Sequence, residues 1–236
     1  MIPNSQLPEP RDHRRNGSVE VHSIFATIQG EGPFTGRPAI FVRLAGCNLQ
    51  CPGCDTEYTA TRKRMDAIEV VKGVQEAGQL ASNTASLVVI TGGEPFRQNI
   101  YPLIDELEDS GYTVQVETNG SMKIDVYQLS DDAVIVCSPK TSKLHPSLRT
   151  VVSAYKYVVT DGNLCPEDGL PLQALGHPAT PKLARPEHGS AVNILVQPRD
   201  EQDEISNARN LEATLLTAYN HNYTVQLQIH KLLKVE

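Results

Sequence analysis

The sequence contains no tryptophan and no excess of positive charge. Its 236 residues include 21 Lys and Arg against 28 Asp and Glu, for a formal net charge of −7. This balance gives no reason to expect nucleic acid as the main partner. No apolar run is long enough to cross a bilayer, and residues 1–17 lack the apolar core of a signal peptide. We therefore expect a cytoplasmic protein that does not contact a membrane.

Cysteine is also scarce, with five residues in all, an odd number that suits a reducing compartment better than a disulfide framework. Three of the five have the spacing Cys-x3-Cys-x2-Cys, at Cys47, Cys51 and Cys54, so their thiolates can converge on one point. A structural zinc site would need a fourth Cys or His, but the nearest are His22 and Cys137. The missing ligand predicts an iron–sulfur cluster with one iron left without a protein ligand.

Short apolar strands alternate with amphipathic helices along the chain. Strands are expected at residues 19–26, 39–44, 87–91, 112–118, 133–137, 155–159, 192–196 and 224–229, and helices at about 66–78, 100–110 and 204–219. The last helix is expected to bury Ala208, Leu211, Leu215 and Ala218. This alternation predicts an α/β fold of parallel βαβ units. Because helices are fewer than strands, we expect an incomplete TIM-type barrel with its site at the carboxyl ends of the strands.

Two segments lack periodicity. Residues 1–18 contain prolines and arginines but few apolar side chains, which predicts a flexible N-terminal tail. Residues 19–236 are expected to form a single domain, interrupted at about 162–189 by an irregular insert with five prolines. Loops of this length are usually functional or disordered, so we expect a semi-ordered insert near the rim of the site.

The cysteine motif and the later run Gly92-Gly93-Glu94-Pro95 resemble the radical S-adenosylmethionine (SAM) enzymes. Flanking segments look like those of the 7-carboxy-7-deazaguanine synthases of the queuosine and deazapurine pathway. These segments are Gln29–Gly32, Gly36–Pro38, Arg43–Leu49, Cys54–Thr56, Glu117–Gly120, Ser138–Lys140, Gln197–Pro198 and Gln228–Lys231. The resemblance covers nearly the whole chain, from about Val21 to the last residue.

The resemblance implies a partial barrel of the radical SAM superfamily and a four-iron, four-sulfur (4Fe-4S) cluster on the three cysteines, whose open iron binds SAM. It also implies Mg²⁺, an electron donor such as a flavodoxin, and a homodimer. The implied activity is that of a carbon–nitrogen lyase. A 5′-deoxyadenosyl radical takes hydrogen from C6 of 6-carboxy-5,6,7,8-tetrahydropterin, and ring contraction with loss of ammonia gives 7-carboxy-7-deazaguanine. No protein residue is expected to be catalytic beyond the cofactor-bound radical.

Positions that match the family's motifs carry its site residues over to this chain. For SAM they are Gly53, Cys54, Asp55, Gly93, Glu94, Glu117, Ser138, Pro139, Lys140, Gln197, Pro198, Arg199 and Asp200. For the substrate they are Ile28, Gln29, Gly30, Arg43, Thr91 and Glu236. A second tier of candidates for the substrate consists of Lys156, His230 and Lys231. For Mg²⁺ the matching positions are Thr56 and Asp55.

Local chemistry bears on some of these assignments. Arg43 stands in an otherwise apolar strand, and a guanidinium pairs with a carboxylate through two parallel hydrogen bonds. Asp55 and Thr56 offer the hard oxygen atoms that suit Mg²⁺, although such residues also cap short turns. Gly53 stands where the superfamily usually has an aromatic residue that stacks near the adenine, so that stacking is excluded here.

Two other functions remain open on the sequence alone. An activase that makes a glycyl radical on a partner protein would share the cluster but lack the set Gln29, Arg43 and Thr56. A non-catalytic zinc-binding module would use the same three cysteines as a zinc knuckle. Cys137, in an apolar strand, and Cys165, in the insert, are not expected to be ligands.

Overall fold

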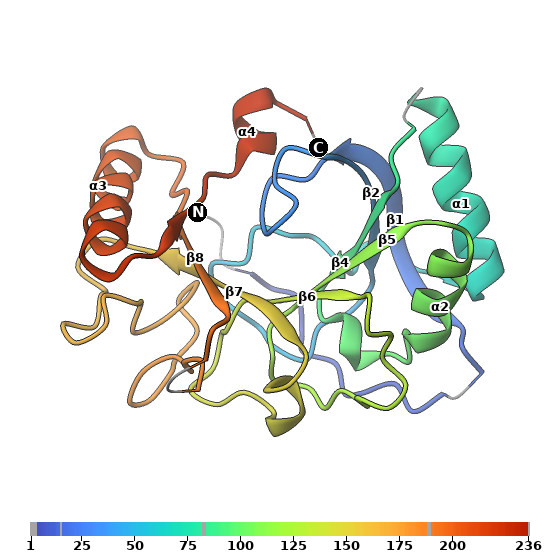
Figure 1. The fold of residues 1–236 in the computed structure, drawn as a ribbon, viewed down its shortest axis with the longest axis horizontal. Helices are drawn as coiled ribbons and strands as arrows, with labels where there is room; N and C mark the ends of the chain where they lie inside the picture. Colours follow the sequence, from blue (N-terminus) through green and yellow to red (C-terminus); the bar gives the residue numbers. More distant parts are fainter. Residues whose placement is uncertain (1–3, 15, 82–83, 188–189, 236) are drawn as a thin grey trace.

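The computed structural model describes residues 4–14, 16–81, 84–187 and 190–235. One sheet organises these residues, and its nine strands lie in the order β3-β1-β2-β4-β5-β6-β7-β8-β9. The strands are β1 (Val19–Ile28), β2 (Pro38–Leu44), β3 (Lys63–Met65), β4 (Leu87–Gly92), β5 (Thr113–Thr118), β6 (Val134–Cys137), β7 (Val152–Val159), β8 (Asn193–Pro198) and β9 (Thr224–Val225). The sheet curves round on itself without closing (Figure 1).

Parallel pairing dominates this sheet. β2 pairs in parallel with β4, and every later neighbour up to β9 is parallel as well, whereas β1 runs antiparallel to both β2 and β3. The first four residues of β4 are fully buried, as expected of an apolar strand covered on both faces. The described residues hold four α-helices against nine strands, so the expected incomplete barrel is confirmed.

The helices are α1 (Ala67–Leu80), α2 (Tyr101–Asp109), α3 (Glu204–His221) and α4 (Ile229–Leu233), and two short 3₁₀ turns lie at η1 (Pro95–Arg97) and η2 (Pro146–Leu148). α1, α2 and α3 cover the outer side of the sheet, whereas α4 lies over the mouth of the cavity on its inner side (Figure 1). α1 begins at the expected N-cap: Asp66 accepts from the Glu69 amide, and the Glu69 side chain accepts from the Asp66 amide. α1 packs on α2 and β1, while α3 packs on β8 at the other end.

The predicted buried face of α3 is only partly right. Ala218 is buried and Leu215 is half-buried, as expected, but Ala208 and Leu211 are exposed. Polar side chains are buried beside Ala218, namely Asn210, Thr214 and Thr217. The buried side chains act as hydrogen-bonding groups: Asn210 Nδ2 donates to Arg199 O at 2.9 Å and Thr217 Oγ1 donates to Gly169 O at 2.7 Å. α3 is therefore oriented by polar contacts to loops, which an apolar periodicity cannot reveal.

The strand expected at residues 224–229 is also wrong beyond its first two residues. β9 ends at Val225 because the side chain of Gln226 binds the turn after β1: its Nε2 donates to Gly32 O at 2.7 Å, and its Oε1 accepts from Gly32 N at 2.8 Å. The chain then forms the short helix α4. β3 was not predicted, and β7 begins three residues earlier than expected, at Val152.

The irregular insert has no helix or strand among its described residues, in agreement with the prediction. Arg185 orders it from within. Its guanidinium lies 2.8 Å from Asp168 Oδ2 and donates to the carbonyl oxygens of Leu170, Pro171 and Leu183. None of the helices in the described part of the chain is long and apolar enough to span a membrane.

The N-terminal segment differs from the flexible tail that the sequence predicts. Residues 4–12 form no helix or strand, yet they make backbone and side-chain hydrogen bonds to the loop that follows β2. Their partners come from residues 47–64 and from Arg97, far away in the sequence, so composition alone could not indicate this order.

Candidate active site

A cavity of about 550 Å³ opens on the inner side of the sheet, where the ends of β4, β5 and β8 meet the loop after β2. Most of the predicted site residues line it: Ile28, Gln29, Arg43, Cys47, Cys51, Gly53, Cys54, Asp55, Thr56, Thr91, Gly93, Glu117, Ser138, Lys140, Gln197, Arg199 and Asp200. So do the second-tier candidates Lys156, His230 and Lys231. The structure thus brings the separate motifs to one place.

Five predicted residues stand apart from this lining. Gly30, Glu94, Pro139 and Pro198 are neighbours of lining residues in the sequence but do not themselves line the cavity. Glu236 lies outside the described residues. Gly30 has a packing role, because a Cβ there would lie 1.8 Å from His230 Nδ1 of α4.

The cysteine loop (residues 45–59) carries three free thiols to the cavity. Burial raises the pKa of Cys47 to about 12 and that of Cys51 to about 11. A buried thiolate needs nearby positive charge, which iron coordination provides. In the described ranges, no three His, Cys, Asp or Glu side chains form a group that could hold a single metal ion. A four-iron cluster does not require one, since each thiolate binds a different iron. The donor set fits such a cluster.

Gly92, which ends β4, and Gly93, which follows it, bring the backbone of that strand against the start of the cysteine loop. A Cβ on Gly93 would lie 2.1 Å from Gly46 O and 2.8 Å from the Cβ of Cys47. Gly92 has φ +136°, and a Cβ there would lie 2.2 Å from Leu44 O. The glycines are therefore needed for protein packing beside the first cysteine, and they fix the distance between the two motifs.

Glu94 is fully buried and binds the ends of two neighbouring strands together. Its carboxylate accepts from Thr118 Oγ1 at 2.7 Å, from Asn119 N at 2.8 Å and from Phe96 N at 3.1 Å. Burial raises the pKa of Glu94 to about 6. A contact between Glu94 and the SAM amino group stays a prediction, since the structure gives this side chain a positioning role between β4 and β5.

The irregular insert reaches the cavity beside the third cysteine. Gly53 N donates to Leu175 O at 2.8 Å. A Cβ on Gly53 would lie 3.2 Å from that oxygen and 2.6 Å from Arg199 Nη2. A larger side chain at residue 53 would therefore displace the insert or Arg199, which explains the absence of an aromatic residue. Leu175 itself lines the cavity and supplies apolar surface there.

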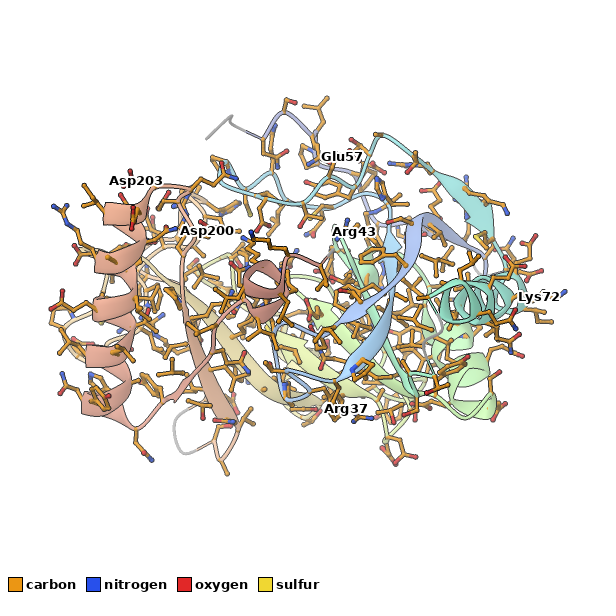
Figure 2. All side chains as sticks on the ribbon, turned by 90° about the horizontal axis from the view of Figure 1, so that it is seen from above. Arg37, Arg43, Glu57, Lys72, Asp200 and Asp203 are labelled. Atoms are coloured by element: carbon orange, nitrogen blue, oxygen red, sulfur yellow. The ribbon has the colours of Figure 1, made fainter. Side chains whose placement is uncertain are left out.

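Arg43 is the cation on the opposite wall. It lies on β2 in register with Thr91 of β4, and its Cζ is 5.0 Å from the centroid of the Phe25 ring. Its Nε is buried and has no hydrogen-bond partner among the residues that the structure describes. Leaving a buried donor unpaired is unfavourable, so this guanidinium suits an anionic ligand. Figure 2 shows Arg43 and Asp200 on either side of α4 when the molecule is seen from above.

A pair of polar side chains forms the acceptor side of the cavity. Glu117, at the end of β5, accepts at Oε1 from Gln29 Nε2 at 3.0 Å and from Gln115 Nε2 at 3.1 Å. One donor, Gln29, directly follows β1, and the other, Gln115, lies on β5 itself; together they fix the direction of the carboxylate. Glu117 can then present acceptor capacity to a ligand that carries amino groups.

Sequence reasoning missed Glu31, the centre of the polar network on this wall. Its carboxylate pairs with Lys156 and accepts from Gln197 Nε2 at 3.0 Å and from Gln228 Nε2 at 2.7 Å. Burial alone would raise the pKa of Glu31, but the charge of Lys156 and these hydrogen bonds lower it to about 2. Its place in the Gln29–Gly32 motif was the available signal.

Asp55 and Thr56 lie at the mouth of the cavity beside α4. Thr56 Oγ1 donates to Asp55 Oδ1 at 3.3 Å. Lys231 Nζ of α4 lies 3.4 Å from Asp55 Oδ2 and 3.1 Å from Asp200 Oδ2, so it connects the cysteine loop to the loop after β8. These hard oxygens fit Mg²⁺, which takes few protein ligands and keeps several waters.

This fold and this site define a radical SAM enzyme. A family model described as the radical SAM superfamily matches residues 42–141. This range includes the cysteine loop, the Gly92–Pro95 run and the segment Glu117–Gly120. The chain is 38% identical over 234 residues to the 7-carboxy-7-deazaguanine synthase of Rhodospirillum rubrum, covering 97% of this chain and 96% of that protein. It is 36% identical to the enzyme of that name from Rickettsia prowazekii, with 92% and 89% covered. The chain belongs to the 7-carboxy-7-deazaguanine synthase family.

A solved structure supports the fold. The crystal structure of QueE from Escherichia coli superposes with a TM-score of 0.65, covers 89% of this chain and 93% of that one, and is 24% identical. The family membership excludes the two alternatives left open by the sequence, the activase and the zinc module. The cofactors that the superfamily implies are a 4Fe-4S cluster and SAM.

Proposed function

We propose that this chain converts 6-carboxy-5,6,7,8-tetrahydropterin into 7-carboxy-7-deazaguanine. Arg43 is the observation that carries the proposal: a half-buried guanidinium whose Nε lacks a partner among the described residues, on the same cavity as three cysteines. A substrate carboxylate would occupy that guanidinium in bidentate geometry. The close relationship to enzymes named for the product supports the same substrate.

Cys47, Cys51 and Cys54 would hold the cluster, and SAM would lie against Gly53, Gly93 and the segments 138–140 and 197–200. When bound, these cofactors supply the one-electron chemistry that removes a hydrogen atom from the substrate. The protein's own part is to position the substrate against the cofactors and to exclude water. The apolar wall around Phe25, Phe41 and Leu175 and the Gly93 turn perform that part.

The two ends of the substrate require partners of opposite character, a cation at one end and hydrogen-bond acceptors at the other. Its carboxylate would bind Arg43, and Mg²⁺ held at Thr56 and Asp55 would share that charge. Its guanidine-like edge carries N–H donors, which Glu117 and the carbonyl of Gln29 can accept. Holding both ends fixes which ring carbon faces the cofactors, and such positioning lowers the barrier to reaction.

We place this activity in a single domain over residues 19–236. A small electron carrier such as a flavodoxin would deliver the electron, and the working protein would be a cytoplasmic homodimer, as the family resemblance suggests. Lys140 also lines the cavity, and its Nζ donates to Ser138 O at 3.0 Å. A cation would therefore lie beside the cofactors.

The test is anaerobic turnover. The reconstituted, reduced protein is incubated with SAM and the carboxytetrahydropterin, with and without Mg²⁺, and the products are identified by mass and absorbance. We expect 7-carboxy-7-deazaguanine, more of it with Mg²⁺, and no product when SAM is omitted. A brown protein that cleaves SAM but leaves this pterin unchanged would contradict the proposed substrate.

A further inference from the structure

The N-terminal segment lies against the outer side of the cysteine loop, and this loop is the part of the chain that carries the cluster ligands. Asn4 Nδ2 donates to Cys51 O at 3.2 Å, and Asn4 N donates to Pro52 O at 3.0 Å. Further along, Glu9 N donates to Cys47 O at 2.7 Å. Two of the three cysteines therefore have their carbonyl oxygens bound by residues that precede the sheet.

Gln6 makes the most specific of these contacts. Its Nε2 donates to Thr56 O at 2.9 Å, and its Oε1 accepts from Tyr58 N at 2.8 Å. One side-chain amide thus pairs with the backbone on both sides of residue 57, as a neighbouring strand would. Thr56 O lies 3.8 Å from Cys54 Sγ, so the carbonyl that Gln6 holds adjoins the third cysteine.

Arg97 joins the same segment to the glycine turn. It belongs to η1, directly after the Gly92–Pro95 run, and only 5% of its side chain is exposed. Its guanidinium donates to Pro10 O at 3.2 Å and to Ala45 O at 3.0 Å, and it lies 3.4 Å from the Glu9 carboxylate. Arg97 therefore contacts the N-terminal segment and the start of the cysteine loop at once.

Glu9 adds a second attachment and explains a glycine. Its carboxylate also binds Arg62, at 2.5 Å and 3.0 Å. A Cβ on Gly46 would lie 2.8 Å from Glu9 Oε2 and 2.7 Å from Arg97 Nη2. Gly46, with φ +80°, precedes the first cysteine, so the close approach of this ion pair depends on the residue beside a cluster ligand.

We propose that residues 4–12 form a positioning strap, in which Gln6 and Glu9 hold the cysteine loop in ligating geometry against the Gly92–Gly93 turn. The inference rests on the proposed role of the three cysteines as cluster ligands. Gln6 is a positioning residue, because it acts on the ligands through the backbone of residues 56–58. The strap explains why a segment of low apolar content is ordered: its hydrogen bonds go to backbone groups of the cysteine loop.

The test compares Gln6→Met with Leu7→Ala. Gln6→Met keeps the side-chain length and removes the two amide hydrogen bonds to the loop backbone, together with the side-chain contacts to Asn4 and Thr59. Leu7 is 73% exposed and serves as the matched control in the same segment. On the anaerobically reconstituted full-length proteins, we measure the rate of iron loss to a chelator. We expect it to rise about tenfold in Gln6→Met, the factor for losing one to two such bonds, and less than about twofold in Leu7→Ala.

Two further readouts separate positioning from a general loss of stability. The electron paramagnetic resonance spectrum of the reduced cluster should change with added SAM in the wild type and in Leu7→Ala, and the changed fraction should fall in Gln6→Met. In the cluster-free protein, hydrogen exchange at the Tyr58 amide should be faster in Gln6→Met, with the midpoint of thermal unfolding unchanged. Removal of residues 1–10 should accelerate iron loss further, since the Asn4 and Glu9 bonds are lost as well.

Wild-type rates of iron loss and a wild-type response to SAM in Gln6→Met would overturn the strap. A different result concerns the substrate: if the wild type forms no deazaguanine while Gln6→Met still loses iron faster, the strap is supported and the proposed substrate is not. Failure of the wild type to bind any cluster would overturn both.

Discussion

The two walls of the cavity are built from different interactions. The cofactor wall is fixed by close backbone contacts and by hydrogen bonds to backbone groups, with Gly93 against Gly46 and the carbonyl oxygens of Cys47 and Cys51 bound from outside. The substrate wall carries charges in a buried setting: Arg43, the pair Glu31 and Lys156, and Glu117. The first wall has a fixed shape, as a rigid cluster requires. The second has directed charge, as an anionic ligand with amino groups requires.

The cofactor wall should respond most strongly to the loss of a single atom. In Cys51→Ala one thiolate is missing, so we expect the protein to hold little iron and to form no detectable product. Iron and sulfide are assayed after anaerobic reconstitution. Cys165→Ala is the control, because this thiol lies in the insert and outside the cavity lining. A Cys51→Ala protein with full iron content and activity would show that Cys51 is not a ligand of the cluster.

The substrate wall should fail in a different way, through an unpaired buried charge. In Lys156→Met the Glu31 carboxylate loses its cation, and both side chains are nearly buried, with 10% and 12% exposure. Breaking such a pair costs about 3–5 kcal/mol. We expect a fall of that order in the free energy of unfolding of the cluster-free protein, measured with denaturant. The double variant Glu31→Gln/Lys156→Met should recover part of it.

The difference in stability between the wild type and Lys156→Met should change with pH in one direction. In the wild type the pKa of Glu31 is lowered to about 2, so its contribution is present at neutral pH and is lost only as the pH falls through that value. Without Lys156, burial raises the pKa of Glu31, and the variant becomes less stable as the pH rises. The gap between wild type and Lys156→Met should therefore widen from pH 5 to pH 8. A constant gap would contradict the pairing.

Much of the sheet and the cofactor wall could be predicted because their signals are local. Cys47, Cys51 and Cys54 lie within one short motif, and β4 is a continuous apolar run. The pairing of Glu31 with Lys156 could not be predicted, since 125 residues separate them and each residue is ordinary in its own surroundings. Their meeting depends on how the curved sheet places the turn after β1 beside β7.

Order in the strap and the orientation of α3 were missed for a related physical reason. Periodicity reports which side chains avoid water, whereas Gln6 and Asn210 are placed by hydrogen bonds to backbone groups of distant loops. A segment with such bonds has the composition of a flexible tail. Sequence patterns therefore predict the apolar part of this fold better than its polar attachments.

Arg43 offers the finest test of the comparison, because a second arginine, Arg37, also stacks on a phenylalanine ring but lies outside the cavity lining. Arg43 stacks on Phe25 at 5.0 Å and lines the cavity, whereas Arg37 stacks on Phe34 at 4.8 Å and does not. Losing charge-assisted hydrogen bonds to the substrate costs about 2–3 kcal/mol, or about 100-fold in kcat/KM. We expect that loss in Arg43→Ala and less than about twofold in Arg37→Ala.

The form of the loss distinguishes recognition from chemistry. If Arg43 binds the carboxylate equally in the bound substrate and during the reaction, KM rises while kcat changes little. Arg43→Lys should restore part of the affinity, since an ammonium supplies charge without the two parallel donors. The cluster content of all three variants should match the wild type, because Arg43 belongs to the other wall. An Arg43→Ala protein that loses its iron would show that the two walls are not independent.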